Sequence, residues 1–143
     1  MSTSVGTESE AQPAGKPGGS PEVQVSRPVA APVTHVWEVL VSPKGAEALL
    51  GEGAELGAKG APYHCADGTS GVVRSYHPLE QLRVSWHEKS DSPPSIIEVD
   101  LRADGAGTVL ELTQNHLNEA SDIDGLTARW SAALAAVAAV AEA

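Results

Sequence analysis

Apolar and polar residues alternate along three segments between positions 82 and 113, a pattern that predicts β-strands with one buried face. The apolar positions are Leu82, Val84 and Trp86, then Ile97, Val99 and Leu101, and finally Leu110 and Leu112. If residue 103 pairs with residue 108 around the turn at 104–107, Leu101 faces Leu110. The turn length and the apolar pattern then specify the same register. Segment 71–77 forms a second hairpin with 82–88 around the turn at 78–81. We therefore expect an antiparallel sheet with a single apolar face.

Two short helices are expected after a first strand that runs from Val23 to about Pro28. The first helix follows Pro32, and its buried stripe consists of Val33, Val36, Trp37 and Leu40. The second begins at Ser42-Pro43 and ends at Gly51, where a glycine-rich loop continues to Gly60. Together they would close one side of the sheet.

The chain ends in the clearest helical pattern of the sequence. Ile123, Leu126, Trp130, Leu134 and Val137 recur at helical spacing, and Ser121 with Asp124 fits a capping box at the start. A helix that continues to about Val140 would be about 30 Å long, enough to cross the sheet. Its other faces carry alanines, which are either exposed helix formers or a close-packed partner surface. A sheet with one apolar face covered by such a helix is an α+β architecture.

Composition adds a domain count and excludes several classes of function. Residues 1–21 are rich in glycine and proline with almost no apolar residues, so we expect a disordered tail ahead of a single domain at 22–143. The formal net charge of -10 disfavours nucleic acid as a partner. The single cysteine excludes an internal disulfide, and no signal peptide or membrane span is expected. We expect a cytoplasmic location and no membrane partner.

Five stretches along the chain form a recognisable set. They are Val25-Ser-Arg-Pro-Val-Ala-Ala-Pro-Val-Thr-His-Val-Trp37, Asp67-Gly68 with Gly71-Val-Val, the run Pro78, Leu82 and Trp86, Gly107-Thr-Val-Leu-Glu-Leu112, and Trp130 with Leu134. Together they resemble the START-like SRPBCC superfamily, and within it the AHSA-type branch named for the activator of the heat-shock protein 90 ATPase. The resemblance covers about residues 22–140.

This resemblance implies a helix-grip fold, in which a curved antiparallel sheet wraps around a long C-terminal helix, often with a cavity between them. Members of the superfamily bind lipids, hormones or polyketides, and some are cyclases or hydrolases. The branch name also raises a co-chaperone role, a chaperone partner or a part in the stress response.

Familiar catalytic and metal-binding motifs do not account for this sequence. Gly51-Glu-Gly-Ala-Glu-Leu-Gly57 lacks the spacing of a dinucleotide-binding loop, and there is no P-loop, HExxH or GxSxG. His64 and Cys65 are metal-ligand types, but neighbouring strand residues point to opposite faces. We expect His64 at the surface, Cys65 buried, and no metal or cofactor. Without a nucleophile or an acid–base pair, an enzyme is the less favoured interpretation.

Strand parity and the tryptophans define a candidate ligand site on the inner face. His77 is expected on the same face as Val73 and Ser75, and Gln114 on the face of Leu112. A buried amide needs a hydrogen-bond partner, which either a ligand or the protein can supply. The full candidate set is Trp37, Tyr63, Val73, Ser75, His77, Val84, Trp86, Val99, Leu112, Gln114 and Trp130. These residues line a pocket or simply fill the core.

Three functions remain open at this point. The first is a carrier that binds an apolar small molecule between the sheet and the long helix. The second is a protein-interaction module, of co-chaperone type or a homodimeric regulator, which would use the alanine-rich helix face. The third is a cyclase or hydrolase that uses polar groups such as His77 and Tyr63.

Overall fold

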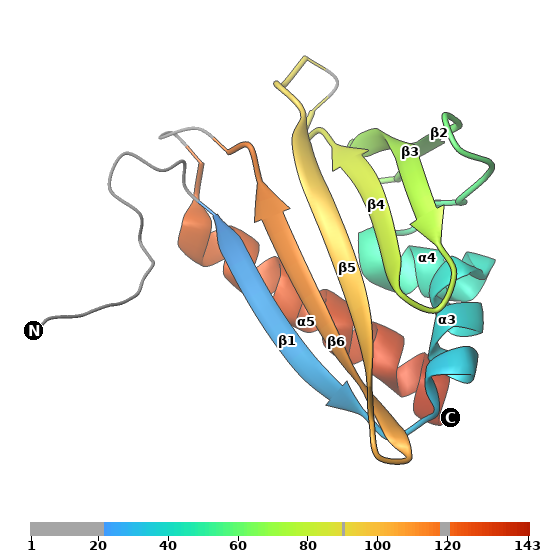
Figure 1. Cartoon of the computed structure of the whole chain (residues 1–143). Helices are drawn as coiled ribbons and strands as arrows, with labels where there is room; N and C mark the ends of the chain where they lie inside the picture. The colour runs from blue at the N-terminus through green and yellow to red at the C-terminus, as the bar shows by residue number, and fades with distance from the viewer. Residues whose placement is uncertain (1–21, 90, 118–120) are drawn as a thin grey trace, which may run out of the picture.

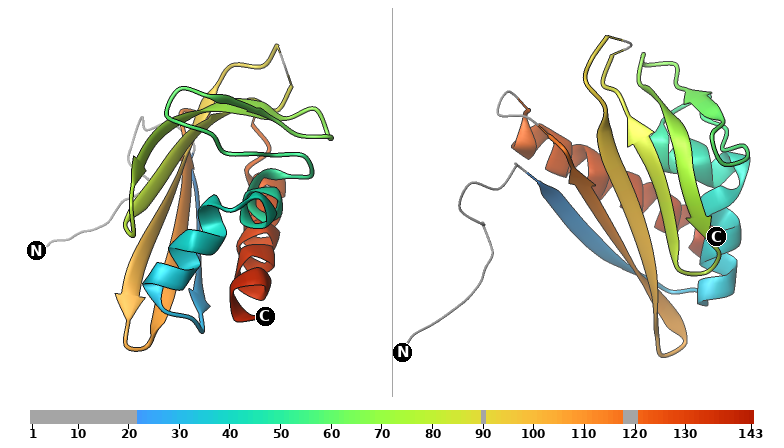
Figure 2. Two further views of the ribbon diagram at one scale, coloured as in Figure 1. Left: turned by 90° about the vertical axis from the view of Figure 1, so that its right-hand side faces the viewer. Right: turned by 45° about the horizontal axis from the view of Figure 1, so that its top comes forward.

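The computed structural model describes residues 22–89, 91–117 and 121–143, and its core is a six-stranded antiparallel sheet in the order β1-β6-β5-β4-β3-β2 (Figure 1). The elements are β1 (Val23–Val29), α3 (Val33–Val41), α4 (Pro43–Leu50), β2 (Pro62–His64), β3 (Ser70–His77), β4 (Gln81–Trp86), β5 (Ser95–Asp104), β6 (Gly107–Asn115) and α5 (Ile123–Glu142). All three of these helices lie on one side of the sheet, and the half formed by β2, β3 and β4 bends over them (Figures 1 and 2). This is the expected helix-grip α+β fold. The tail expected at 1–21 lies outside the described residues.

The hairpin of β5 and β6 has the register that the apolar pattern predicts. Ala103 pairs with Thr108 and Leu101 pairs with Leu110, so the inner face of this hairpin is apolar. Strand β1 pairs with the other edge of β6 and adds Val23 and Val29 to the same face.

Helix α5 covers this face with the stripe that its helical spacing predicts. Trp130, Leu134 and Val137 are each at most 1% exposed. Full burial of an aliphatic side chain of this size stabilises a fold by about 1.5–3 kcal/mol. By length and composition alone α5 would also be able to span a membrane, which the sequence analysis did not anticipate. In this fold one stripe of the helix is buried.

The helix starts follow local capping chemistry, with one correction. Ser42 Oγ accepts a hydrogen bond of 3.1 Å from the Gly45 amide, and Pro43 occupies the first turn of α4 as expected. At α5 the cap is Asp122, whose carboxylate accepts from the Gly125 amide at 3.0 Å, and not Ser121 with Asp124. Asp122 suits this position because a carboxylate is also favourable at the positive end of the helix dipole.

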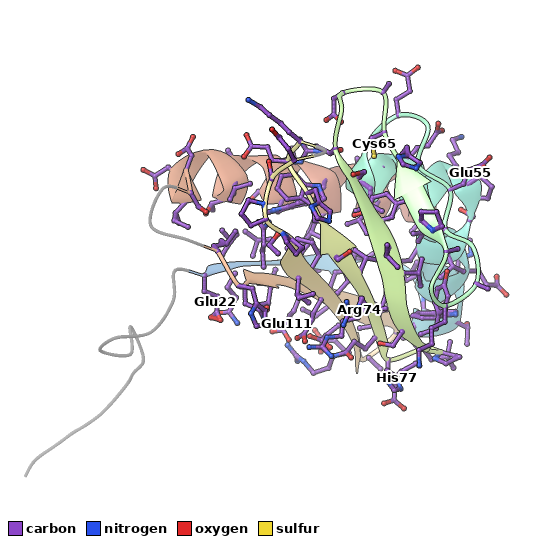
Figure 3. All side chains as sticks on the ribbon, turned by 90° about the horizontal axis from the view of Figure 1, so that it is seen from above. Glu22, Glu55, Cys65, Arg74, His77 and Glu111 are labelled. Atoms are coloured by element: carbon purple, nitrogen blue, oxygen red, sulfur yellow. The ribbon has the colours of Figure 1, made fainter. Side chains whose placement is uncertain are left out.

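A β-bulge in β3 overturns the inward placement of Ser75 and His77. Val73 pairs with Val84 and faces inward, but the register shifts before Ser75, which pairs with Arg83. Ser75 and His77 therefore share the outer face, while Tyr76 takes the inward position opposite Leu82. Figure 3 shows His77 on the side of the sheet away from the helices.

Candidate functional site

A chain of buried hydrogen bonds joins the sheet to α5 at the centre of the inner face. Gln114 is fully buried; its Oε1 accepts from Trp130 Nε1 at 2.7 Å, and its Nε2 donates to Ser95 Oγ at 2.8 Å. Ser95 Oγ in turn donates to the carbonyl of Trp86 at 3.2 Å. The inward position of Gln114 is as predicted, and of the two open interpretations the structure shows an amide whose partners come from the protein.

Two of the three tryptophans form a pair at the end of this chain of hydrogen bonds. The rings of Trp86 and Trp130 meet edge to face, with centroids 5.5 Å apart and an interplanar angle of 73°. Trp37 lies apart from them on α3 and packs edge to face on Tyr76 at 6.4 Å. The structure therefore does not bring the three tryptophans to one pocket wall.

Arg129 holds this aromatic pair from the helix side, and sequence reasoning missed it. Its guanidinium carbon is 5.2 Å from the ring centroid of Trp86 and also 5.2 Å from that of Trp130. The same group donates to the Leu50 carbonyl at 3.0 Å and lies 3.3 Å from Asp67 Oδ2. Arg129 thus connects α5 to the end of α4 and to the turn after β2.

The turn at Asp67 is ordered by its own hydrogen bonds. Asp67 Oδ1 accepts from the backbone amide of Thr69 at 3.0 Å and from its hydroxyl at 2.7 Å. Burial raises the pKa of Asp67, but these hydrogen bonds and the Arg129 charge outweigh it and hold the pKa below its ordinary value. The nearby Cys65 is buried and His64 exposed, as expected, and burial raises the pKa of the Cys65 thiol. Among the residues that the structure describes, no group of three or more His, Cys, Asp or Glu side chains is placed to hold a metal ion.

A cavity of about 180 Å³ opens beside Trp86, where the β4–β5 connection faces the segment between β6 and α5. Trp86 is the only one of the predicted site residues that lines it. The other lining residues are Glu88, Ser92, Pro93, Ser95, His116, Leu117, Ser121 and Leu126. The cavity wall therefore combines apolar side chains, such as Trp86 and Leu126, with polar side chains from the two connecting segments.

The remaining predicted site residues occupy three different environments. Val73, Val84, Val99 and Leu112 are core residues at most 1% exposed. Tyr63 is also buried, and its hydroxyl donates to the Ser85 carbonyl at 2.6 Å. His77 borders open hollows on the outer face of the sheet, and Ser75 borders one of them. Ser75 and His77 are therefore separated by the sheet from the cavity beside Trp86.

The residues that sequence reasoning missed lie mainly on connections. His116 and Leu126 line the cavity, and His116 has a φ of 62°, a left-handed conformation that is uncommon outside glycine. Such conformations are enriched at functional sites. The alternation of apolar and polar residues carries no information about the φ of His116. The apolar periodicity of α5 predicted that Leu126 is a core residue, but not that it lines a cavity.

Comparisons with known proteins agree with this architecture. The family model described as "Activator of Hsp90 ATPase homolog 1-like protein" matches residues 30–142. The chain belongs to this family. A comparison with curated proteins gives no match.

Several solved structures share the fold of this family member. DynU16, from the dynemicin biosynthetic locus, has a TM-score of 0.70 and 22% identity over 82% of this chain, which spans 46% of DynU16. MLL2253 from Mesorhizobium loti has a TM-score of 0.74 and 18% identity, covering 84% of this chain and 96% of that protein. The Aha1 dimer from Colwellia psychrerythraea has a TM-score of 0.72 and 14% identity, with coverages of 85% and 96%. At these identities the likeness concerns the fold.

Proposed function

We propose that this family member binds a small, largely apolar molecule in the cavity beside Trp86. The observation that carries the proposal is the position of that cavity, between the β4–β5 connection, the segment after β6 and the first turn of α5. Leu117 and Leu126 supply apolar wall, while Ser92 and His116 supply hydrogen-bonding groups. This mixture is typical of small-molecule sites.

The size of the cavity limits the ligand to about one ring with a short substituent. Apolar cavities of about 150 Å³ accommodate benzene, and this one has a volume of about 180 Å³. The middle of the inner face offers less room, because Leu112 and Gln114 are fully buried among their neighbours. The proposed site therefore lies at the end of the core rather than at its centre.

The test is native mass spectrometry of protein purified gently from its own source, compared with two tryptophan variants. Leu126→Trp fills the cavity from its helix wall. Ala128→Trp adds the same side chain to an exposed position of the same helix and serves as the matched control. An adduct seen with the wild type and with Ala128→Trp but lost in Leu126→Trp supports the proposal. An adduct retained in Leu126→Trp, or no adduct in any of the three proteins, contradicts it.

A second candidate function is protein interaction through α5. Ala128, Ala132 and Ala139 are exposed along this helix, where charged residues are the usual choice on a solvated face. One solved neighbour of the same fold is described as a dimer. The same mass spectra report the oligomeric state, and a dimer that Ala132→Arg dissociates would favour this alternative.

A further inference from the structure

Trp86 lines the proposed site and carries a buried hydrogen-bond donor without a partner. The side chain is 4% exposed, and its Nε1–H has no acceptor among the described residues. Trp130, against which it packs, donates its own Nε1–H to Gln114 at 2.7 Å. Buried indole N–H groups usually find an acceptor, so the contrast between the two adjacent rings needs an explanation.

Two polar neighbours of the Trp86 ring, Ser95 and Arg129, do not supply the acceptor. Ser95 also lines the cavity, but its hydroxyl accepts from Gln114 and donates to the carbonyl of Trp86. Arg129 lies over the face of the Trp86 ring and is a donor only. The missing group is an acceptor, and the cavity is the space beside this ring in which a ligand would bring one.

We infer that the ligand carries an uncharged oxygen acceptor, such as a ketone, ester or amide carbonyl, that pairs with Trp86 Nε1–H. This inference rests on the proposed function and names the class of molecule that the site selects. The N–H is covered in this structure, so its pairing requires a small shift of the Trp86 ring or of the side chains that cover it.

Charge around the cavity favours a neutral acceptor over a carboxylate. Glu88 lines the cavity, and the chain carries a formal net charge of -10. Arg129 is the nearby cation, but Asp67 and the Leu50 carbonyl already engage its guanidinium, and Arg129 is not among the residues that line the cavity. An anion would therefore enter a negative environment without gaining a dedicated ion pair.

Three probes of nearly identical shape test the need for an oxygen acceptor and the need for a neutral ligand separately. They are acetophenone, α-methylstyrene and benzoate. Acetophenone has the carbonyl, α-methylstyrene replaces its oxygen with a methylene group, and benzoate replaces its methyl group with a charged oxygen. Heteronuclear NMR of the isotope-labelled full chain resolves one indole resonance for each of the three tryptophans. Trp86→Phe identifies the resonance of Trp86, and Trp130, already paired with Gln114, is the internal control.

We expect acetophenone to bind about tenfold more tightly than either other probe, the difference that a buried hydrogen bond typically makes. The Trp86 indole proton should move downfield with acetophenone alone, while the Trp130 proton stays near its position. Equal binding of acetophenone and α-methylstyrene, or tighter binding of benzoate, overturns the inference on ligand class and leaves the proposed function standing. A Trp86 proton that already resonates at a hydrogen-bonded position without any probe overturns it as well, since water is then its acceptor. If none of the probes binds at millimolar concentration, both the inference and the proposed site are wrong.

Discussion

At the scale of single residues, identical side chains have different roles because their immediate partners differ. Trp86 and Trp130 share one aromatic contact and one guanidinium, yet among the residues that the structure describes only Trp130 has a hydrogen-bond acceptor for its indole N–H. Gln114 is the residue that makes the difference, because its amide is oriented by Ser95 and presents its oxygen to α5. Burial alone would therefore not have distinguished a structural tryptophan from a candidate binding tryptophan.

Tyr63 gives a prediction for stability at alkaline pH. Burial raises the pKa of its phenol well above the ordinary value of 10.0; the Cys65 charge acts in the same direction and Arg129 opposes both. When a group has a higher pKa in the folded state than in the unfolded state, it stabilises the fold at every pH below the unfolded-state pKa. This contribution is lost as the pH rises from the unfolded-state pKa to the folded-state pKa. Tyr63→Phe should lower the free energy of unfolding by about 1 kcal/mol at neutral pH, because the bond to the Ser85 carbonyl is lost.

Above about pH 10 the wild type should lose stability faster than Tyr63→Phe, so that the two unfolding curves converge. Urea unfolding followed by tryptophan fluorescence across this range measures the effect. Tyr76→Phe is the graded comparison: burial also raises the pKa of Tyr76, but this side chain is only half-buried, so its removal should flatten the decline less than Tyr63→Phe does. A decline with pH that is equally steep in wild type and Tyr63→Phe would contradict the prediction.

At the scale of whole elements, alternation predicted the long hairpin and failed at one bulge. The pairing of Leu101 with Leu110 follows from period-two burial, which any one-residue slip would reverse. In β3 strict alternation would expose Tyr76 and bury Ser75 and His77. The bulge instead lets Tyr76 pack on Trp37 and leaves the polar residues at the outer face. The only trace of the bulge in the sequence is that Tyr76, an aromatic residue, falls on the outer face under strict alternation. Its inward position is explained only by its contact with Trp37 on α3.

The start of α5 supplies a prediction that separates two sequence interpretations of the same helix. Asp122→Ala should lower the free energy of unfolding by about 1 kcal/mol, because the Gly125 amide loses its acceptor. Asp124→Ala removes a carboxylate of equal charge from the same turn but affects only the helix dipole, so its cost should be smaller.

Chemical denaturation of both variants measures these costs at low and at moderate salt. The Asp124→Ala effect should shrink as salt screens the dipole, whereas the hydrogen-bonded cap of Asp122 should be less sensitive. If Asp124→Ala proves the more damaging of the two, the capping box expected from Ser121 and Asp124 describes the helix better than the Asp122 cap.

At the scale of the molecule, sequence patterns predicted the layers of the fold but not the position of the cavity. The sheet, the covering helix and the burial of Trp86, Gln114 and Trp130 follow from periodicity. The cavity depends on where two connecting segments, around Ser92 and His116, come to lie against Trp86. Such segments have no repeating pattern, so their packing is determined by the finished fold.

The excess of acidic residues leads to a last prediction, on salt. The chain has a formal net charge of -10, and its described ion pairs, such as Arg83 with Glu98 at 2.8 Å, are partly exposed and individually weak.

Raising sodium chloride from about 0.01 M to about 0.1 M shortens the screening length from about 30 Å to about 10 Å. Because screening then relieves repulsion throughout the compact state, we expect the Tm to rise by about 2–4 °C in calorimetry. Glu55→Lys, at an exposed position, removes one negative charge and adds one positive charge, so it should raise the Tm at low salt while reducing its salt dependence. Glu98→Lys makes the same change in net charge but also removes the partner of Arg83, so it should gain less. A Tm that falls with salt would mean that local ion pairs outweigh the net repulsion.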